Sequence, residues 1–404
     1  MGDLVEVRTT GAAVGGGAVG RDPGGRAVFV DDALPGELVV VRLDRVRRRY
    51  ARGRAVEVLE ASPSRVAPPC PEVLAGCGGC DLQHASLDEQ HSMKRAVVAD
   101  VFERIAGVAA PDISLRALPS AGYRSTLRVG VVDGRAAFRS RGSHHLHAVE
   151  SCMVAHPLLD ELVSEGRFGS AREVTLRVGV RTGERMAVID GPLAGVRLPP
   201  DVVQARAGAR GGGAPPFIHE IVDGTRFRIS AGSFFQSGPE GAEALTAEVR
   251  RTLDASGWSA TPGTVVDLYA GVGLLGATAV DPAANLVAVE GSRRAAADAR
   301  HNLSFRSGAT ETVAVAVEEW TPRPAEVVIA DPSRSGLQRI GVERVLATGA
   351  ATVVLVSCDA GALGRDAGLL VAGGYRVDEV TVVDLFPHTH HVEVVTRFTL
   401  ERAG

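Results

Sequence analysis

Residues 264–273 read Thr-Val-Val-Asp-Leu-Tyr-Ala-Gly-Val-Gly, an apolar run followed by a glycine-rich turn. The run 265–268 is mostly apolar, as expected for a strand that is covered on both faces. Similar runs follow at 286–289, 327–330 and 353–356. This rhythm of buried strand, turn and helix predicts a doubly wound α/β domain in the C-terminal half of the chain.

The residues that follow three of these strands predict a cofactor cleft. The first strand leads into Gly271-Val-Gly273, the second ends at Glu290, and the third ends at Asp331. Ligands of such sheets bind at the carboxyl ends of the strands, where an acid can also accept ribose hydroxyls. Dinucleotide sites share the glycine pair. A nicotinamide cofactor and a chance arrangement of unrelated residues are therefore alternatives on this pattern alone.

A fourth strand end carries a cysteine, Cys358. A thiol at the exposed end of a strand is well placed to act as a nucleophile, although a lone cysteine there is more often a buried packing residue. Glu393 stands where a histidine-rich turn meets a final strand, 394–400, and beside a nucleophile it is a candidate general base. His390 and His391 are adjacent and would point to opposite faces of a strand, so we predict no zinc site there.

The N-terminal segment has a different pattern, with short strands punctuated by glycine. Strands at 5–8, 27–30, 37–43 and 50–59 predict a small β-barrel of the oligonucleotide-binding kind. The glycine-rich stretch 11–20 predicts a mobile loop.

The middle of the chain predicts a linker followed by a mixture of elements. Proline-rich residues 61–71 are typical of a linker, and four-residue spacing of apolar side chains predicts a helix over 87–105. We expect short alternating strands over 120–200, and a loop or hinge over 208–216.

Length and composition limit the class of protein. The 404 residues are 45% hydrophobic with a net charge of −4, which predicts two or three globular domains. No apolar run is long enough to span a bilayer and the N-terminus lacks a signal-peptide pattern, so we expect a cytoplasmic protein without a membrane partner. Seven arginines stand against one acid between Arg42 and Arg54. They could neutralise nucleic-acid phosphates or simply form a solvated strand face.

The five cysteines divide into a group of four and one that stands apart. Cys70, Cys77, Cys80 and Cys152 lie in the first half, whereas Cys358 is alone near the end. A cytosolic protein holds few disulfides, and the division suits a metal site together with a lone nucleophile. Four thiolates suit a [4Fe–4S] cluster and zinc equally.

Over nearly its whole length the chain resembles the RNA uracil-5-methyltransferase family that carries an N-terminal TRAM domain and an iron–sulfur cluster. The motifs that carry this resemblance are the TRAM-like segments 20–30 and 34–37, the cysteine motif 70–80 with Gln83-His84, the Phe-x-Gln motif 234–236, the Asp-Pro-Ser-Arg-Ser-Gly box 331–336, and the signature regions 357–358 and 386–393.

The resemblance implies a multidomain fold. We expect an OB-like TRAM β-barrel that binds RNA over 1–62, and a small central iron–sulfur α+β domain over 63–215. A Rossmann-like α/β domain that depends on S-adenosyl-L-methionine (SAM) would occupy 216–404.

The resemblance also implies a role for ten residues, since family motifs match their positions. The implied residues are Cys358 and Glu393 for catalysis, Gln236, Tyr269, Glu290 and Asp331 for SAM, and Cys70, Cys77, Cys80 and Cys152 for a [4Fe–4S] cluster.

The implied reaction is methylation of carbon 5 of a uridine in RNA. Cys358 would add to carbon 6, carbon 5 would take the methyl group of SAM, and Glu393 would remove the carbon-5 proton before Cys358 leaves. The base must be flipped out of its stack, with Phe234 or Phe235 as a stacking partner. TRAM and cluster together favour 23S ribosomal RNA over transfer RNA, and we expect the protein to be a monomer.

Three residues depart from the family pattern, namely Asp359, Leu274 and Ser333. An unpaired carboxylate at 359 would raise the pKa of the Cys358 thiol and slow catalysis. An RNA-binding homologue that has lost turnover is therefore an alternative. A nicotinamide oxidoreductase that uses the cluster for electron transfer is another alternative, but that function would require neither Glu393 nor the barrel.

Overall fold

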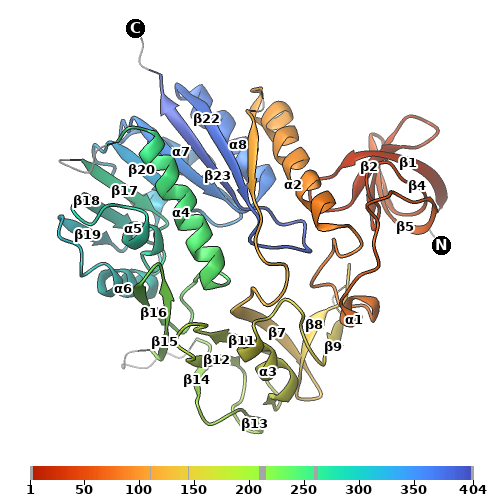
Figure 1. Ribbon diagram of the computed structural model, residues 1–404, viewed down its shortest axis with the longest axis horizontal. Coiled ribbons are helices and arrows are strands. Elements are labelled where there is room, and N and C mark those ends of the chain that lie inside the picture. The colour runs from red at the N-terminus through yellow and green to blue at the C-terminus, as the bar shows by residue number, and fades with distance from the viewer. Residues whose placement is uncertain (1–2, 110, 144, 209–214, 259–262, 402–404) are drawn as a thin grey trace.

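A computed structural model describes residues 3–109, 111–143, 145–208, 215–258 and 263–401. Most of the loop or hinge predicted at 208–216 falls outside the described residues. Figure 1 shows the N-terminal barrel beside helix α2, a region of short strands below, and a large sheet with its helices above.

The N-terminal strands form a closed barrel, which confirms the prediction for this segment. The barrel has the order β1-β2-β3-β5-β4. Its strands are β1 (Leu4–Ala12), β2 (Ala18–Arg21), β3 (Ala27–Asp31), β4 (Leu38–Val46) and β5 (Tyr50–Glu60).

The loop predicted over 11–20 is shorter than expected and covers residues 13–17, because β1 continues to Ala12 and β2 begins at Ala18. Gly20 explains the difference. A Cβ atom there would lie 2.3 Å from the carbonyl oxygen of Arg8 on the paired strand. Glycine therefore permits close packing of strands at this position rather than mobility.

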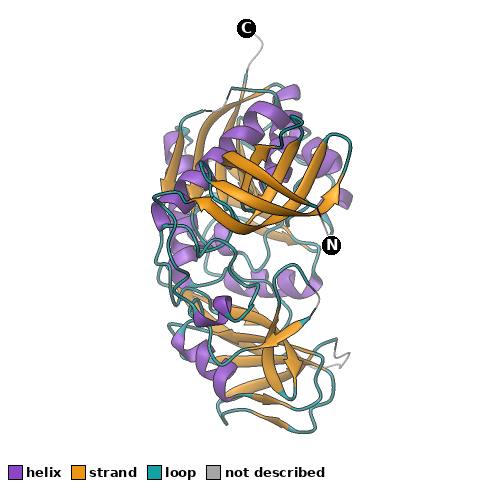
Figure 2. Ribbon diagram, turned by 90° about the vertical axis from the view of Figure 1, so that its right-hand side faces the viewer, coloured by secondary structure: helices purple, strands orange, loops and turns teal. Residues whose placement is uncertain are grey.

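The central region is built on a six-stranded sheet of order β14-β12-β11-β7-β8-β9, the lower sheet in Figure 2. Its strands are β7 (Thr126–Val132), β8 (Arg135–Arg139), β9 (Leu146–Ala148), β11 (Glu173–Val178), β12 (Arg185–Asp190) and β14 (Val202–Arg206). The expected strands over 120–200 are interrupted by helix α3 (Pro157–Glu165), which packs on this sheet through Leu159 and Leu162. Smaller elements nearby are α1 (Pro71–Leu74), β10 (Arg167–Phe168), β13 (Val196–Arg197) and the hairpin β15 (Phe217–Val222) and β16 (Thr225–Ser230).

The C-terminal half forms an eight-stranded sheet, which confirms the doubly wound α/β prediction. The strands, in spatial order, are β19 (Thr310–Val313), β18 (Asn285–Val289), β17 (Thr264–Leu268), β20 (Val327–Ala330), β21 (Thr352–Ser357), β23 (Val394–Leu400), β22 (Tyr375–Val383) and β6 (Ile113–Arg116). Strands β17 to β21 are parallel, and β23 is antiparallel to both of its neighbours.

Helices cover both faces of this sheet, because successive strand residues point to opposite sides. On β17, Val265 packs with helices α4 (Pro239–Ala255), α5 (Leu274–Thr278) and α6 (Arg293–Asn302). Its neighbour Val266 packs with α2 (Leu87–Val101), α7 (Gln338–Leu346) and α8 (Ala360–Ala372). The helix predicted over 87–105 is confirmed, since α2 continues as a π-helical turn, η1 (Phe102–Ala106).

A segment of the N-terminal half is built into the C-terminal sheet. Strand β6 pairs in parallel with β22 at its edge. A Cβ atom on Gly364 of α8 would lie 2.9 Å from the carbonyl oxygen of Val101, so α8 and α2 approach closely. The domain boundaries at 62/63 and 215/216 stay a prediction, to which the structure adds that α2 and β6 pack on the C-terminal sheet.

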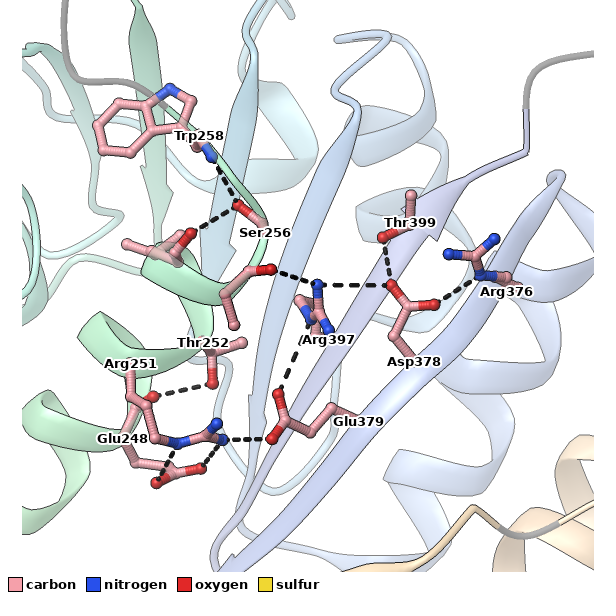
Figure 3. Close-up of polar contacts among 12 residues, drawn as sticks. Glu248, Arg251, Thr252, Ser256, Trp258, Arg376, Asp378, Glu379, Arg397 and Thr399 are labelled. Atoms are coloured by element: carbon pink, nitrogen blue, oxygen red, sulfur yellow. Dashed lines mark hydrogen bonds and ion pairs between the residues drawn. The ribbon is translucent and has the colours of Figure 1, made fainter.

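A polar network fixes α4 beside the β22–β23 hairpin (Figure 3). Arg251 of α4 donates to Glu248 and to Glu379 of β22, both at 2.6 Å. Arg397 of β23 donates to the carbonyl oxygen of Ala255 at 3.3 Å, and also pairs with Asp378. The helix that follows Gln236 and the strand that follows Glu393 are thereby held together.

Across the described part of the chain, every helix falls short of the length and apolar character that a bilayer-spanning segment needs.

Candidate active site

Four predicted site residues each lie immediately after the last residue of a strand. They are Tyr269 after β17, Glu290 after β18, Asp331 after β20 and Cys358 after β21. The strand ends coincide because Leu268, the last residue of β17, pairs with Val289 of β18 and Ala330 of β20. The register of the strands therefore explains why the predicted residues meet at the carboxyl edge of the sheet.

Glu393 reaches the same edge from the opposite direction. It precedes β23, which runs antiparallel to β21, and the first residue of β23, Val394, pairs with Ser357. The candidate base therefore lies at the end of the sheet that presents Cys358.

All six residues that were predicted for catalysis and cofactor binding line one cavity of about 520 Å³. They are Gln236, Tyr269, Glu290, Asp331, Cys358 and Glu393. Further lining residues were not selected from the sequence as site residues, and include Asp267, Arg334, Phe386 and His391. Asp267 could have been found, because it is the one acid in an otherwise apolar strand.

The glycine turn after β17 has a conformation that favours glycine. Gly271 and Gly273 have φ of 58° and 87°, and Tyr269 adopts a φ of 60° that is unusual for a residue with a side chain. The Glu290 carboxylate accepts the amides of Gly271 at 2.9 Å and of Ser292 at 2.6 Å. The Glu290 carboxylate therefore connects the turn after β17 with the turn after β18. Tyr269, in the first of these turns, lines the cavity.

Buried carboxyl groups gather in the cavity. Burial, together with the charge of Asp331, raises the pKa of Asp267 to about 7. Burial also raises the pKa values of Asp331 and Glu393, and Asp331 adds to the shift at Glu393. Among the described residues, neither Oδ1 of Asp267 nor Oε1 of Glu393 has a hydrogen-bond partner. Such a cavity suits a ligand that carries positive charge.

Cys358 is half-buried, and its surroundings favour the thiol over the thiolate. Burial raises its pKa to about 12, with further contributions from Glu393 and Asp331, while Arg334 acts in the opposite direction. A thiolate would form more readily once a cation offset the charge of the two acids.

Asp359, the residue beside the thiol, is paired rather than unpaired. It is the N-cap of α8, and its Oδ1 accepts the amide of Ala362 at 2.8 Å. The acids that raise the pKa of Cys358 are Glu393 and Asp331. The slowing expected from an unpaired carboxylate at 359 is therefore not supported.

The turn that carries Gln236 is held from two sides. Asp298 of α6 is fully buried and accepts the hydroxyl groups of Ser230 and Ser233, both at 2.8 Å. Arg177 donates to the carbonyl oxygen of Ser233 at 2.8 Å. Gln236 is thus presented to the cavity by a turn whose buried polar groups are satisfied.

The two neighbouring phenylalanines differ in their surroundings. Phe234 lines the cavity and is 70% exposed. Phe235 is buried against Phe227, with their ring centroids 5.7 Å apart. Only Phe234 of the pair therefore has a face that is open to a stacking ligand.

The four N-terminal cysteines line a second cavity of about 230 Å³. Cys70, Cys77 and Cys80 are buried, Cys152 is half-buried, and all four are free thiols. Within the described ranges, no three histidine, cysteine or acidic side chains are arranged to hold a metal ion. The structure thus gathers the predicted ligands around one cavity without a preformed site for a single ion.

The arginine block lies on β4, β5 and the turn between them, and most of it faces solvent. Arg52 stacks on Phe29, with its guanidinium carbon 5.2 Å from the ring centroid, and Arg54 pairs with Asp32 at 3.3 Å. Arg47, Arg48 and Arg49 are exposed. The barrel therefore presents positive charge to solvent.

Comparisons with known proteins agree with this geometry. Residues 1–56 match the model of the TRAM domain. The chain is 35% identical to a 23S rRNA (uracil(1939)-C(5))-methyltransferase of Chromohalobacter salexigens, over 95% of this chain and 87% of that protein. It is 34% identical to an uncharacterised RNA methyltransferase of Streptomyces avermitilis, over 98% of both chains.

A solved structure has the same fold over the whole chain. It is a Pyrococcus abyssi tRNA (uracil-54, C5)-methyltransferase in complex with S-adenosyl-L-homocysteine. The TM-score is 0.73 at 23% identity, and the match covers 98% of this chain and all of that one. The identity and coverage of the curated relatives place the protein among the RNA uracil-5-methyltransferases, and it belongs to the members of that family that carry a TRAM domain.

Proposed function

We propose that the protein transfers a methyl group from SAM to carbon 5 of one uridine in RNA, through a covalent bond between Cys358 and the uracil. The observation that carries this proposal is a shared cavity. Cys358 and Glu393 line the same cavity as the predicted cofactor residues, at the carboxyl edge of the sheet. A nucleophile, an acid that can exchange protons and a cofactor site are thereby within reach of one flipped base.

The charge of the cavity fits the proposed cofactor. SAM carries a positively charged sulfonium, and when bound it supplies an electrophilic methyl group. Glu290 would accept the ribose hydroxyls, because it stands at the end of the second strand of the cofactor half. The raised pKa values of Asp267 and Asp331 indicate carboxyl groups that a neighbouring cation would help to ionise.

The chain's own residues account for the remaining steps. The Cys358 thiolate adds to carbon 6 of uracil, which places electron density on carbon 5 and allows that carbon to take the methyl group. Glu393 then accepts the carbon-5 proton, the ring double bond re-forms, and the bond to Cys358 breaks. Phe234, with its exposed ring, would stack on the flipped base.

The nucleophile is tested with RNA that contains 5-fluorouridine. Fluorine cannot leave as a proton does, so wild-type protein and labelled SAM should give a stable protein–RNA adduct on a denaturing gel. Cys358→Ala should give none, because no sulfur is available to add at carbon 6. Asp359→Asn is the matched control, since an amide can still cap α8, and it should trap at a rate close to that of wild type. Trapping by Cys358→Ala would refute the assignment.

The affinity for SAM should increase with pH from about 6 to about 8, because Asp267 has a pKa of about 7. A cation binds best once this carboxyl group has lost its proton, so binding should release protons at the lower end of that range. Calorimetry in two buffers of different ionisation enthalpy measures both quantities. Asp267→Asn should weaken binding and flatten the pH dependence. Absence of SAM binding at every pH would favour an RNA-binding protein without turnover.

We further propose that Cys70, Cys77, Cys80 and Cys152 hold a [4Fe–4S] cluster within a central domain, 63–215. A tetrahedral zinc site needs all four sulfurs about 2.3 Å from one centre, whereas a cluster is larger and suits a cavity of about 230 Å³. Gln83 Nε2 and Arg124 Nε belong to residues that line this cavity, and these buried donors have no partner within the described structure. Such donors fit the sulfur atoms of an anionic group. We expect the cluster to be structural.

Protein that is purified without oxygen should therefore contain iron and absorb broadly in the visible range. Cys77→Ser should lower the iron content, because one ligand is lost and the remaining thiols cannot complete the set. Cys358→Ser, a cysteine outside this cavity, is the control and should retain iron. Elemental analysis together with the visible spectrum measures the result, and zinc without iron would contradict the proposal.

The RNA substrate is proposed to be 23S ribosomal RNA. A TRAM barrel and 35% identity to a 23S rRNA methyltransferase support this choice, while the tRNA enzyme of similar fold is only 23% identical. Mass spectrometry should find that one 5-methyluridine of 23S RNA is lost from a strain that lacks this protein. Restoration by the wild-type gene, and not by Cys358→Ala, is the control. Loss of 5-methyluridine from transfer RNA instead would assign the other substrate.

A further inference from the structure

The segment that leads into Glu393 has no regular secondary structure. Residues 384–393 connect β22 to β23 without helix or strand. Most of its described hydrogen bonds to other parts of the protein come from side chains and backbone of residues 81–94 and from Tyr123. The carbonyl oxygen of Glu393 accepts the amide of Val383 at 2.8 Å, so the sheet holds the end of the segment. The path of the residues before Glu393 depends on contacts with the N-terminal half of the chain.

Asp81 contacts the segment three residues before Glu393. Its Oδ1 accepts the backbone amide of His390 at 2.9 Å, and its Oδ2 contacts the Nδ1 atom of the same residue. The next residue, Leu82, donates its amide to the carbonyl oxygen of His388 at 2.9 Å. His390 is thus held through both its backbone and its ring.

Contacts on α2 and Tyr123 fix the earlier part of the segment. Gln90 accepts the amide of His388 at 2.7 Å, where the chain has a φ of 66°. Lys94 donates to the carbonyl oxygen of Phe386 at 3.0 Å, and the hydroxyl of Tyr123 donates to that of Pro387 at 2.9 Å. Since these bonds already hold residues 386–388, Asp81 acts on the residues that follow, where Nη2 of Arg334 also lies 3.4 Å from Nε2 of His391.

The same segment lies between the two cavities. Asp81 directly follows Cys80, which lines the cysteine cavity. Arg124 also lines that cavity, and its guanidinium carbon lies 5.5 Å from the ring centroid of Phe386, which lines the active-site cavity. Arg124 therefore contacts the wall of the active-site cavity at Phe386, while Asp81 contacts His390, the neighbour of the lining residue His391.

We propose that Asp81 is a positioning residue for Glu393, acting through His390, and that the segment carrying Cys80 thereby sets the geometry of proton removal. This inference rests on the proposed function. Cys358 directly follows β21 and has its own support, because β21 is paired on both sides. Loss of Asp81 should therefore affect the two catalytic groups differently.

The chemical consequence is specific to one step. Addition of the thiolate at carbon 6 and transfer of the methyl group to carbon 5 need Cys358 and SAM. Release needs Glu393 to accept the carbon-5 proton, so that the carbon–hydrogen electrons re-form the double bond and the carbon–sulfur bond breaks. If Glu393 is misplaced, the methylated base should remain bonded to Cys358.

The experiment follows formation and decay of this adduct in single-turnover reactions with unmodified RNA and labelled SAM. Asp81→Ala and His390→Ala should slow decay by about tenfold or more, part of the 10²–10⁴ that a general base contributes. Adduct formation should change by less than about threefold. Glu393→Gln is the reference, since it should accumulate adduct directly.

A conservative variant and a matched control distinguish an effect on the position of Glu393 from a general defect of the fold. His390→Asn keeps a side-chain donor for Asp81 and should restore much of the decay rate. His219→Ala is the control, because His219 also contacts a carboxylate, that of Glu184 at 3.1 Å, but lies on β15. The adduct of His219→Ala should decay at the wild-type rate.

Several outcomes would overturn the inference. Equal loss of adduct formation and decay in Asp81→Ala would indicate a structural defect, and an unchanged decay rate would remove any role in positioning. Iron content is measured in parallel, and its loss in Asp81→Ala would assign the residue to the cysteine site instead. If the proposed function itself were wrong, the result would differ from all of these, because wild-type protein would form no adduct even with 5-fluorouridine RNA.

Discussion

The register of the parallel strands is the constraint on which the site depends. Leu268 pairs with both Val289 and Ala330, so consecutive strands end level with one another. Each residue that follows a strand end is therefore delivered to one edge without help from a long loop. The antiparallel β23 adds Glu393 to this edge because its first residue pairs with Ser357 of β21. A shift of one residue in any strand would turn its terminal side chain toward the opposite face.

The buried carboxyl groups distinguish the cavity from an apolar core. An ionised carboxylate loses favourable hydration on burial, and the raised pKa values of Asp267, Asp331 and Glu393 reflect this cost. These groups stabilise the fold most when protonated, below their unfolded pKa. The contribution of Asp267 is lost as the pH rises through about 7. A cation in the cavity would offset the repulsion among the ionised carboxylates, so the groups whose ionisation destabilises the fold favour a cationic ligand.

Local patterns in the sequence were enough to predict the barrel, the doubly wound sheet and the strand-end residues, because strand periodicity and turn glycines are encoded locally. Other features depend on distant partners. Gly20 is explained by Arg8 on the neighbouring strand, and strand β6 finds its partner β22 far along the chain. Asp359 was misjudged because its role as a helix cap depends on where α8 begins. The contact between Asp81 and His390 spans 309 residues, a pairing that no local pattern encodes.

That long-range contact also bears on how the site is assembled. Strands β17 to β23 can bring Cys358 to the sheet edge through their own pairing, but residues 386–388 and 390 have partners on the N-terminal half. Closing so long a loop costs chain entropy before the contact can stabilise anything. The segment before Glu393 should therefore become ordered late, after α2 and the cysteine-bearing segment have docked on the sheet. The sheet therefore holds the nucleophile and the backbone of the base, whereas the path of the residues before the base depends on the contact between the two halves.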